Sequence, residues 1–140
     1  MMLEQMNGNG RSGEEQNEAA EQVFKEGFCC ATGQGVAVDM ERAMELYLQA
    51  SGMGHREAQC MAGYLLLHGE CVEQDCARGA ELLRQSAEQG HALGQYWYGK
   101  CLVEGNGVEQ NEAEGNEYLE RSAKQGNTLA VEELNKRSKC

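Results

Sequence analysis

Apolar and polar residues alternate along this chain with the period of an α-helix. Within residues 55–68, Ala58, Ala62 and Leu66 stand four positions apart, which places them on one face of a helix. Gly63 lies on the same face, although a glycine inside a helix costs about 1 kcal/mol relative to alanine. The pattern predicts amphipathic helices, and the glycine indicates a place where a second helix approaches closely.

The whole pattern returns every 36 residues. Gly27, Gly63 and Gly99 mark the same position in three copies, and no insertion separates the copies. Periods of this length are typical of solenoids, in which each unit stacks on the next. We therefore predict three two-helix repeats and a terminal helix that opens a fourth copy. The predicted repeats are 19–54, 55–90 and 91–126, with first helices over 19–32, 55–68 and 91–104, second helices over 40–52, 76–88 and 112–124, and the terminal helix over 127–138.

Each predicted loop carries the same signals in the same order. A glycine suited to a left-handed helix end comes first, then a valine that we expect to plug the loop into the core, and then a residue that caps the next helix. The terminal helix has a polar side that we expect to face outward as a cap, formed by Glu132, Glu133 and Lys136. The loop residues are Gly33, Val36 and Asp39 in the first copy, Gly69, Val72 and Asp75 in the second, and Gly105, Val108 and Asn111 in the third.

Composition and charge narrow the classes of function. Residues 1–17 hold few apolar side chains, so we predict a flexible leader there and a solenoid over 18–139. The net charge of −11 disfavours nucleic acid and anionic membranes and favours a neutral or basic protein or peptide partner. No apolar run is long enough to cross a membrane, and we expect no membrane insertion. The chain starts without a secretory signal, which favours a cytoplasmic protein, or a secreted one if a signal has been removed.

The repeat unit resembles the Sel1-like repeat, a relative of the tetratricopeptide repeat. The first copy carries the resemblance through Gly27, Gly33, Gly35, Val36, Asp39, Ala43, Tyr47 and Gly54, and the third through Gly99, Gly105, Gly107, Val108, Ala123 and Gly126. The resemblance implies an all-α fold: a right-handed α/α solenoid of about three and a half 36-residue two-helix repeats. It also implies an adaptor that assembles protein complexes.

Three positions depart from the family pattern. Cys71 replaces a loop glycine in the second copy, which predicts a stiffer or differently turned loop. Glu26 stands at an apolar position and Cys30 at a tyrosine position of the first copy. We therefore expect the first copy to be weakly packed on its outer side.

Candidate binding residues lie on the first helices, opposite the buried face. This face of a solenoid lines its inner surface, and aromatic residues and Met are enriched at binding hot spots. Packing between repeats is the alternative role, which we weigh evenly for Tyr64 and Trp97 and favour for Phe28 and Met61. The candidates are Phe28, Met61, Tyr64, His68, Trp97, Lys100 and Glu104.

We found no sequence signal for catalysis, metal or cofactor binding. The chain has no motif of a metalloprotease, a serine hydrolase or a P-loop, and its cysteines and histidines do not cluster at ligand spacing. Some relatives carry disulfides within each repeat; here Ser51 occupies the place of the partner that Cys60 would need, which favours a reducing compartment. We predict a non-catalytic adaptor that binds a peptide or protein on its concave face. A secreted or host-directed effector and a regulatory subunit of an enzyme complex are the alternatives.

Overall fold

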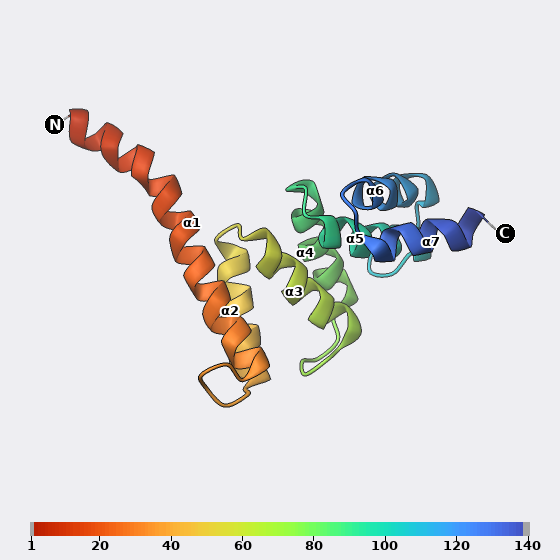
Figure 1. Ribbon diagram of the computed structural model, residues 1–140, viewed down its shortest axis with the longest axis horizontal. Helices are drawn as coiled ribbons and strands as arrows, with labels where there is room; N and C mark the ends of the chain where they lie inside the picture. Colours follow the sequence, from red (N-terminus) through yellow and green to blue (C-terminus); the bar gives the residue numbers. More distant parts are fainter. Residues whose placement is uncertain (1, 139–140) are drawn as a thin grey trace. The chain divides into compact units, whose positions relative to one another are not determined.

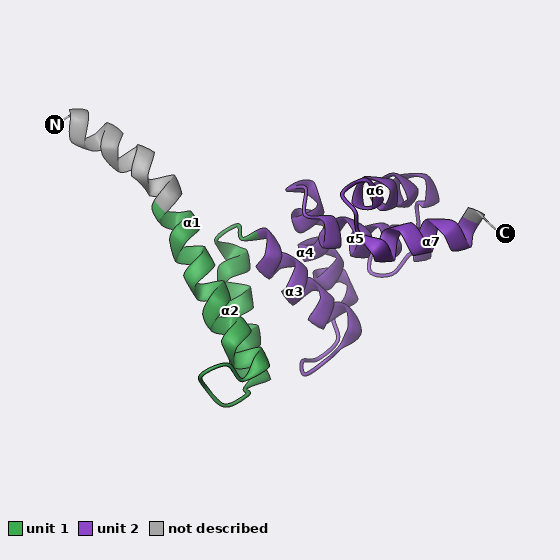
Figure 2. Ribbon diagram, viewed as in Figure 1, with its two compact units in different colours: residues 1–55 green, residues 56–140 purple. Residues whose placement is uncertain are grey.

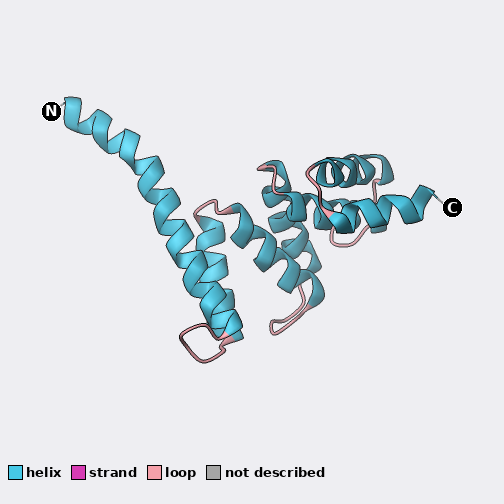
Figure 3. Cartoon of the chain, viewed as in Figure 1, coloured by secondary structure: helices cyan, strands magenta, loops and turns pink. Residues whose placement is uncertain are grey.

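The computed structural model of the chain describes residues 2–138, with side chains for residues 15–137. The described residues form seven α-helices and no strand, joined by short loops (Figures 1 and 3). The helices are α1 (Met2–Thr32), α2 (Met40–Gly52), α3 (Arg56–His68), α4 (Cys76–Glu88), α5 (Ala92–Glu104), α6 (Glu112–Lys124) and α7 (Thr128–Ser138).

The predicted helices agree with the observed ones to within a residue, apart from the start of α1. Helix α1 begins at Met2, so it overlaps the leader predicted over residues 1–17. The side chains of residues 1–14 lie outside the described part of the chain, and the flexible leader over residues 1–17 stays a prediction.

Contacts divide the chain into two compact units (Figure 2). Unit 1 is Met1–His55, in which α1 packs along α2, and unit 2 is Arg56–Cys140. Within unit 2 each helix packs on the next one along the chain from α3 to α7, and α3 also touches α5. The division falls at the predicted boundary between the first and second repeats. The prediction of one continuous solenoid over 18–139 stays a prediction.

The helix starts are capped as the sequence predicts. The backbone N–H of Arg42 donates to Oδ1 of Asp39 at 3.0 Å, and that of Arg78 donates to Oδ1 of Asp75 at 3.1 Å. Asn111 accepts a bond of the same kind from the N–H of Glu114 at 3.1 Å. These bonds satisfy donors that a helix start leaves without a partner.

The loops after the first helices turn through left-handed residues. Gly33, Gly69 and Gly105 have φ of 79°, 67° and 70°. Cys71 has φ of 62°, close to the 77° of Gly35 and the 76° of Gly107 at the equivalent positions. The prediction of a differently turned loop is therefore wrong: the turn is kept, and a side chain is held in a region that favours glycine.

Unit 2 holds a core built between paired glycines. A Cβ on Gly63 would lie 2.9 Å from the carbonyl oxygen of Gly79, and one on Gly79 would lie 2.8 Å from the oxygen of Gly63. Gly99 and Gly115 approach in the same way, which confirms the packing role of the mid-helix glycines. The resulting core contains Cys60, Leu67, Ala80, Leu83, Ala87, Tyr98, Cys101 and Leu102.

The prediction that the loop valine packs into the core is confirmed for the third loop and wrong for the first. Val108 packs against the core of unit 2, and Val72 is half-buried. Val36 is 53% exposed. The physical reason is that the third loop packs on α4, whereas a Cβ on Gly35 of the first loop would meet nothing within 4 Å.

Unit 1 is held by a smaller core of α1 and α2. Tyr47 and Ala43 are fully buried, and the ring of Phe24 lies 5.6 Å from that of Tyr47. Phe24 also stacks on His55 at 4.7 Å, and Nε2 of His55 lies 2.7 Å from a carboxylate oxygen of Glu21. These contacts hold the C-terminal part of α1 against α2.

Candidate functional site

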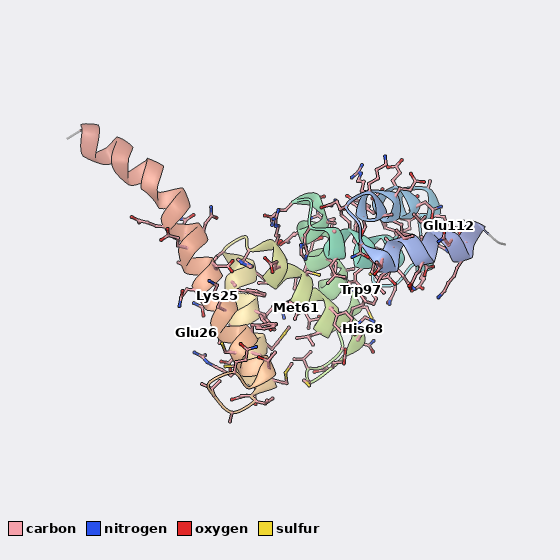
Figure 4. The ribbon with its side chains drawn as sticks, in the orientation of Figure 1. Lys25, Glu26, Met61, His68, Trp97 and Glu112 are labelled. Atoms are coloured by element: carbon pink, nitrogen blue, oxygen red, sulfur yellow. The ribbon has the colours of Figure 1, made fainter. Side chains whose placement is uncertain are left out.

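Three predicted residues meet in one aromatic cluster on unit 2. Tyr64 and His68 lie one turn apart on α3, with ring centroids 4.3 Å apart, and Trp97 of α5 meets both rings edge-on at 5.0 and 5.2 Å. Figure 4 labels Trp97 and His68 on neighbouring helices. We name Tyr64, His68 and Trp97 the aromatic cluster. His68 is exposed, whereas Tyr64 and Trp97 are half-buried.

Trp97 belongs to both the core and the surface. It packs against the core around Leu83 and against a second core of unit 2 formed by Tyr96, Leu119 and Ala130. The ring of Tyr96 lies 4.9 Å from that of Trp97. Packing and binding are therefore not alternatives here, because a half-buried ring anchored in the core is rigid enough to serve as a binding anchor.

A charged group formed by Lys100, Glu104 and Glu133 lies near Tyr96, whose ring meets that of Trp97. Nζ of Lys100 lies 3.4 Å from Oε2 of Glu104 and 3.6 Å from Oε1 of Glu133. Burial lowers the pKa of Lys100, but Glu104, Tyr96 and Glu133 together outweigh it and leave the pKa raised. Lys100 therefore keeps its charge, and its two carboxylates hold it in place beside the rings.

Carboxylates surround the phenol groups of this surface. Burial, followed by a hydrogen bond to Glu70, raises the pKa of Tyr64. Burial is also the main cause of the raised pKa of Tyr96, to which Glu133, Glu104 and Glu132 add while Lys100 opposes them. Both phenols stay neutral donors, and the charged groups that act on Tyr96 are carboxylates apart from Lys100.

The remaining predicted residues do not join the cluster in the described contacts. Phe28 lies in unit 1, is 40% exposed and has its ring 6.4 Å from that of Phe24. Met61 is half-buried on α3, one turn before Tyr64 and two turns before His68 (Figure 4). The structure thus brings Tyr64, His68 and Trp97 together on unit 2 and pairs Lys100 with Glu104 on α5.

Sequence reasoning missed Glu133, which we expected to face outward on the terminal helix. Its side chain is 19% exposed and pairs with Lys100 of α5. The repeat register contained the signal, because Glu133 stands 36 residues after Trp97 and so occupies the same face of its helix.

The titratable groups in and below this surface are engaged in hydrogen bonds or buried. Nδ1 of His68 lies 3.0 Å from the carbonyl oxygen of Tyr64, to which it donates a hydrogen bond. Burial, with smaller effects from nearby charges, raises the pKa of Cys60 and of Cys101 to about 12, and both thiols stay protonated near neutral pH. The described cysteines Cys29, Cys30, Cys60, Cys71, Cys76 and Cys101 are free thiols.

Among the described residues, no helix has the length and apolar character that a membrane span requires.

Comparison with known proteins identifies the repeat. The family model of the Sel1 repeat matches residues 24–55, 56–91 and 92–127. The comparison with curated proteins found no significant match.

Three solved structures show the same fold. A Sel1 repeat protein from Oxalobacter formigenes is 23% identical with a TM-score of 0.74, and the alignment covers 90% of this chain and 98% of that one. Cysteine rich protein B of Helicobacter pylori is 16% identical with a TM-score of 0.66, covering 85% and 94%.

The third structure is larger than this chain. It is a protective antigen of uropathogenic Escherichia coli with an SLR fold, 29% identical with a TM-score of 0.78. The alignment covers 92% of this chain but only 27% of that protein. The three matched repeats span most of the described residues and the solved structures share their all-α arrangement, so this chain belongs to the Sel1 repeat family.

Proposed function

We propose that the chain is a non-catalytic adaptor that binds a protein segment on the face formed by α3, α5 and α7. Proteins of the Sel1 repeat family generally mediate protein–protein interactions, and the fold generally serves as a non-catalytic scaffold. The observation that carries the proposal is the aromatic cluster, in which Trp97 is anchored in the core while the ring of His68 remains exposed.

The aromatic cluster supplies the apolar part of the binding surface. Rigid aromatic side chains lose little conformational entropy on binding and bury a large area, which is why a few of them dominate binding energies. Their T-shaped contacts fix the rings before any partner arrives. A partner would place an apolar or aromatic side chain beside them.

The surrounding charges favour a basic segment. Glu104, Glu132 and Glu133 lie around Tyr96 and Lys100, so carboxylates outnumber the one lysine of this group. A lysine or arginine next to the apolar anchor would pair with these carboxylates and with the faces of the rings. An acidic segment would be repelled, and the net charge of −11 adds to that effect.

The fluorescence of Trp97, which is the one tryptophan of the chain, tests the proposal. The probe is a peptide array in which each sequence holds one aromatic or leucine anchor flanked by lysine or arginine, beside a matched array with glutamate in place of the basic residues. We expect members of the basic array to change the emission of Trp97 with dissociation constants of about 1–100 µM, a range typical of short unstructured segments. The acidic array should leave the emission unchanged.

Variants link the binding to this face. His68→Ala removes an exposed ring and should weaken binding by about tenfold, or roughly 1.4 kcal/mol, without unfolding the chain. Arg78→Ala, exposed on α4, is the matched control and should bind as the parent does. Equal binding of both arrays, or equal effects of the two variants, would contradict a specific site at the aromatic cluster.

A further inference from the structure

The loop between α5 and α6 borders a pocket of about 370 Å³ in unit 2, which we name the loop pocket. This volume lies in the range typical of sites that hold a small ligand or a single side chain. Leu102 and Val108 form the apolar part of its lining. Leu102 belongs to the core of unit 2 and Val108 packs against that core, so this part of the pocket is held in place by the fold.

A nearly buried hydroxyl opens into the loop pocket. Tyr98 lines the pocket and is 5% exposed, and its ring meets that of Tyr118 edge-on at 5.1 Å. Among the described residues its hydroxyl forms no hydrogen bond, and it is not one of the enclosed polar atoms without a partner, which belong to Tyr47 and Asn116. The hydroxyl therefore reaches solvent through the pocket that Tyr98 lines, and a ligand there would supply the partner that it lacks.

The charged side chains that line the loop pocket are both carboxylates. Glu109 stands in the loop and Glu114 in the first turn of α6, and both are exposed. Neither forms an ion pair in the part of the chain that the structure describes. Two cations of unit 2 are engaged elsewhere, because Arg84 is held by two carboxylates of α4 and Arg121 stands over the neighbouring tyrosine ring. The pocket therefore keeps a negative charge that the chain does not neutralise.

The polar groups of the loop pocket are mainly hydrogen-bond acceptors. Nε2 of Gln110 donates to the carbonyl oxygen of Val103 at 2.8 Å, which leaves Oε1 of Gln110 to accept a bond. The carboxylates of Glu109 and Glu114 are acceptors as well. A guanidinium matches this set, because it carries five N–H donors in one plane and no acceptor. The apolar part of the pocket suits the methylene stem that carries the guanidinium in arginine.

The repeat does not require this arrangement. All three loops keep the same left-handed turns, although the residues around them differ. The third repeat alone combines a tyrosine with a glutamate at the positions of Tyr98 and Glu114. The equivalent pairs are Glu26 with Arg42 in the first repeat and Ala62 with Arg78 in the second. The hydroxyl and the carboxylate are therefore not needed for the fold of the loop.

We propose that the loop pocket is a second docking site, which accepts one arginine side chain of a partner protein. The guanidinium donates to the carboxylates of Glu109 and Glu114 and to the oxygen of Tyr98. The methylene stem lies on Leu102 and Val108. The charge of the pocket favours an arginine within a protein over free arginine, because the α-carboxylate of the free amino acid would be repelled by the two glutamates.

Titration of the full chain with capped amino acids tests this site. The probes are N-acetylarginine methylamide and its citrulline counterpart, in which an uncharged urea group of similar shape replaces the guanidinium. Binding is followed through the backbone N–H signals of Gln110 and Glu114 in ¹⁵N-labelled protein. We expect a dissociation constant of about 1–10 mM for the arginine probe, as suits one side chain, and binding of the citrulline probe that is at least about tenfold weaker.

Matched variants assign the binding to the named groups. Tyr98→Phe keeps the ring in the core and removes only the hydroxyl, so it should weaken the arginine probe by about threefold. Glu114→Gln removes one negative charge at nearly constant size and should weaken it by about fivefold or more. Glu120→Gln removes the same charge from an exposed position of α6 that does not line the pocket, and it should bind as the parent does.

Three outcomes would overturn the proposal. Equal binding of the two probes, or no saturable shift with either, would show that the pocket does not recognise a guanidinium. Equal weakening by Glu114→Gln and Glu120→Gln would reduce the effect to the net charge of the chain. Tighter binding of free L-arginine than of the capped residue would assign the pocket to a small molecule.

The loop pocket and the aromatic cluster can be tested separately, because they share no residue. His68→Ala should leave the affinity for the arginine probe unchanged. Failure of the arginine titration therefore leaves the proposed function standing, and loss of the Trp97 response to the peptide arrays leaves the arginine site standing.

Discussion

The position of a residue within the repeat determines its backbone conformation in this chain. Cys71 is an example in which the residue type does not suit that conformation. Glycine occupies the equivalent positions 35 and 107 because a left-handed turn is nearly free for it. Cys71 adopts the same turn with φ of 62°. The repeat, and not the residue, therefore determines the backbone at this position.

Replacing Cys71 by glycine should stabilise the chain. A side chain in the left-handed region costs roughly 1–2 kcal/mol, part of which the greater freedom of glycine in the unfolded chain offsets. We expect Cys71→Gly to raise the free energy of unfolding by about 0.5–1 kcal/mol, measured by urea denaturation with circular dichroism. Cys71→Ala keeps the strained turn and should give no gain. Equal gains in both variants would show that the thiol, and not the backbone, is the cause.

At the scale of helices and loops, the periodic pattern predicted nearly everything that depends on neighbours in the sequence. The six paired helices and the terminal helix lie where the period places them, because caps such as Asp75 and turn glycines such as Gly69 are local signals. The exposure of Val36 and the inward position of Glu133 were missed, because they depend on which helix lies across the loop or the face.

The contact between the third loop and α4 gives a measurable difference between two equivalent glycines. Gly35→Ala meets open space and carries only the left-handed strain, about 1 kcal/mol. Gly107→Ala adds a collision with the backbone of Cys76, and we expect it to cost about 3 kcal/mol in all. Urea denaturation of both variants measures the difference. Equal costs would mean that the third loop does not lie on α4.

At the scale of the whole molecule, stability should decline on the alkaline side. Cys60 and Cys101 have pKa values of about 12 in the folded chain because they are buried, whereas an unfolded cysteine titrates near about 8.5. The folded state thus holds more protons above pH 8.5 or so, and each thiol contributes stability that is present below this pH and lost as the pH rises towards 12.

The expected slope is up to about 1.4 kcal/mol per pH unit for each thiol. Urea denaturation at about pH 7.5 and pH 9.5 measures this change in the free energy of unfolding. Both pH values lie below the ordinary pKa of tyrosine. Cys60→Ala and Cys101→Ala should each flatten the dependence, although both lower stability at neutral pH by leaving small cavities. Cys71→Ala, at an exposed position, should keep the slope of the parent. A slope that all three variants share would assign the effect to other groups.

The sequence by itself determined the all-α repeat, the bounds of its helices apart from the start of α1, and the face on which Tyr64, His68, Trp97 and Lys100 lie. These features follow from spacing and caps, which act between residues close in the chain. Only the tertiary structure decided that the three rings touch, that Glu133 joins Lys100 and that the first repeat keeps an open hollow beside Cys29. The reason is that such contacts form between helices far apart in the sequence, and the repeat period sets the face of each helix but not which side chains meet across two helices.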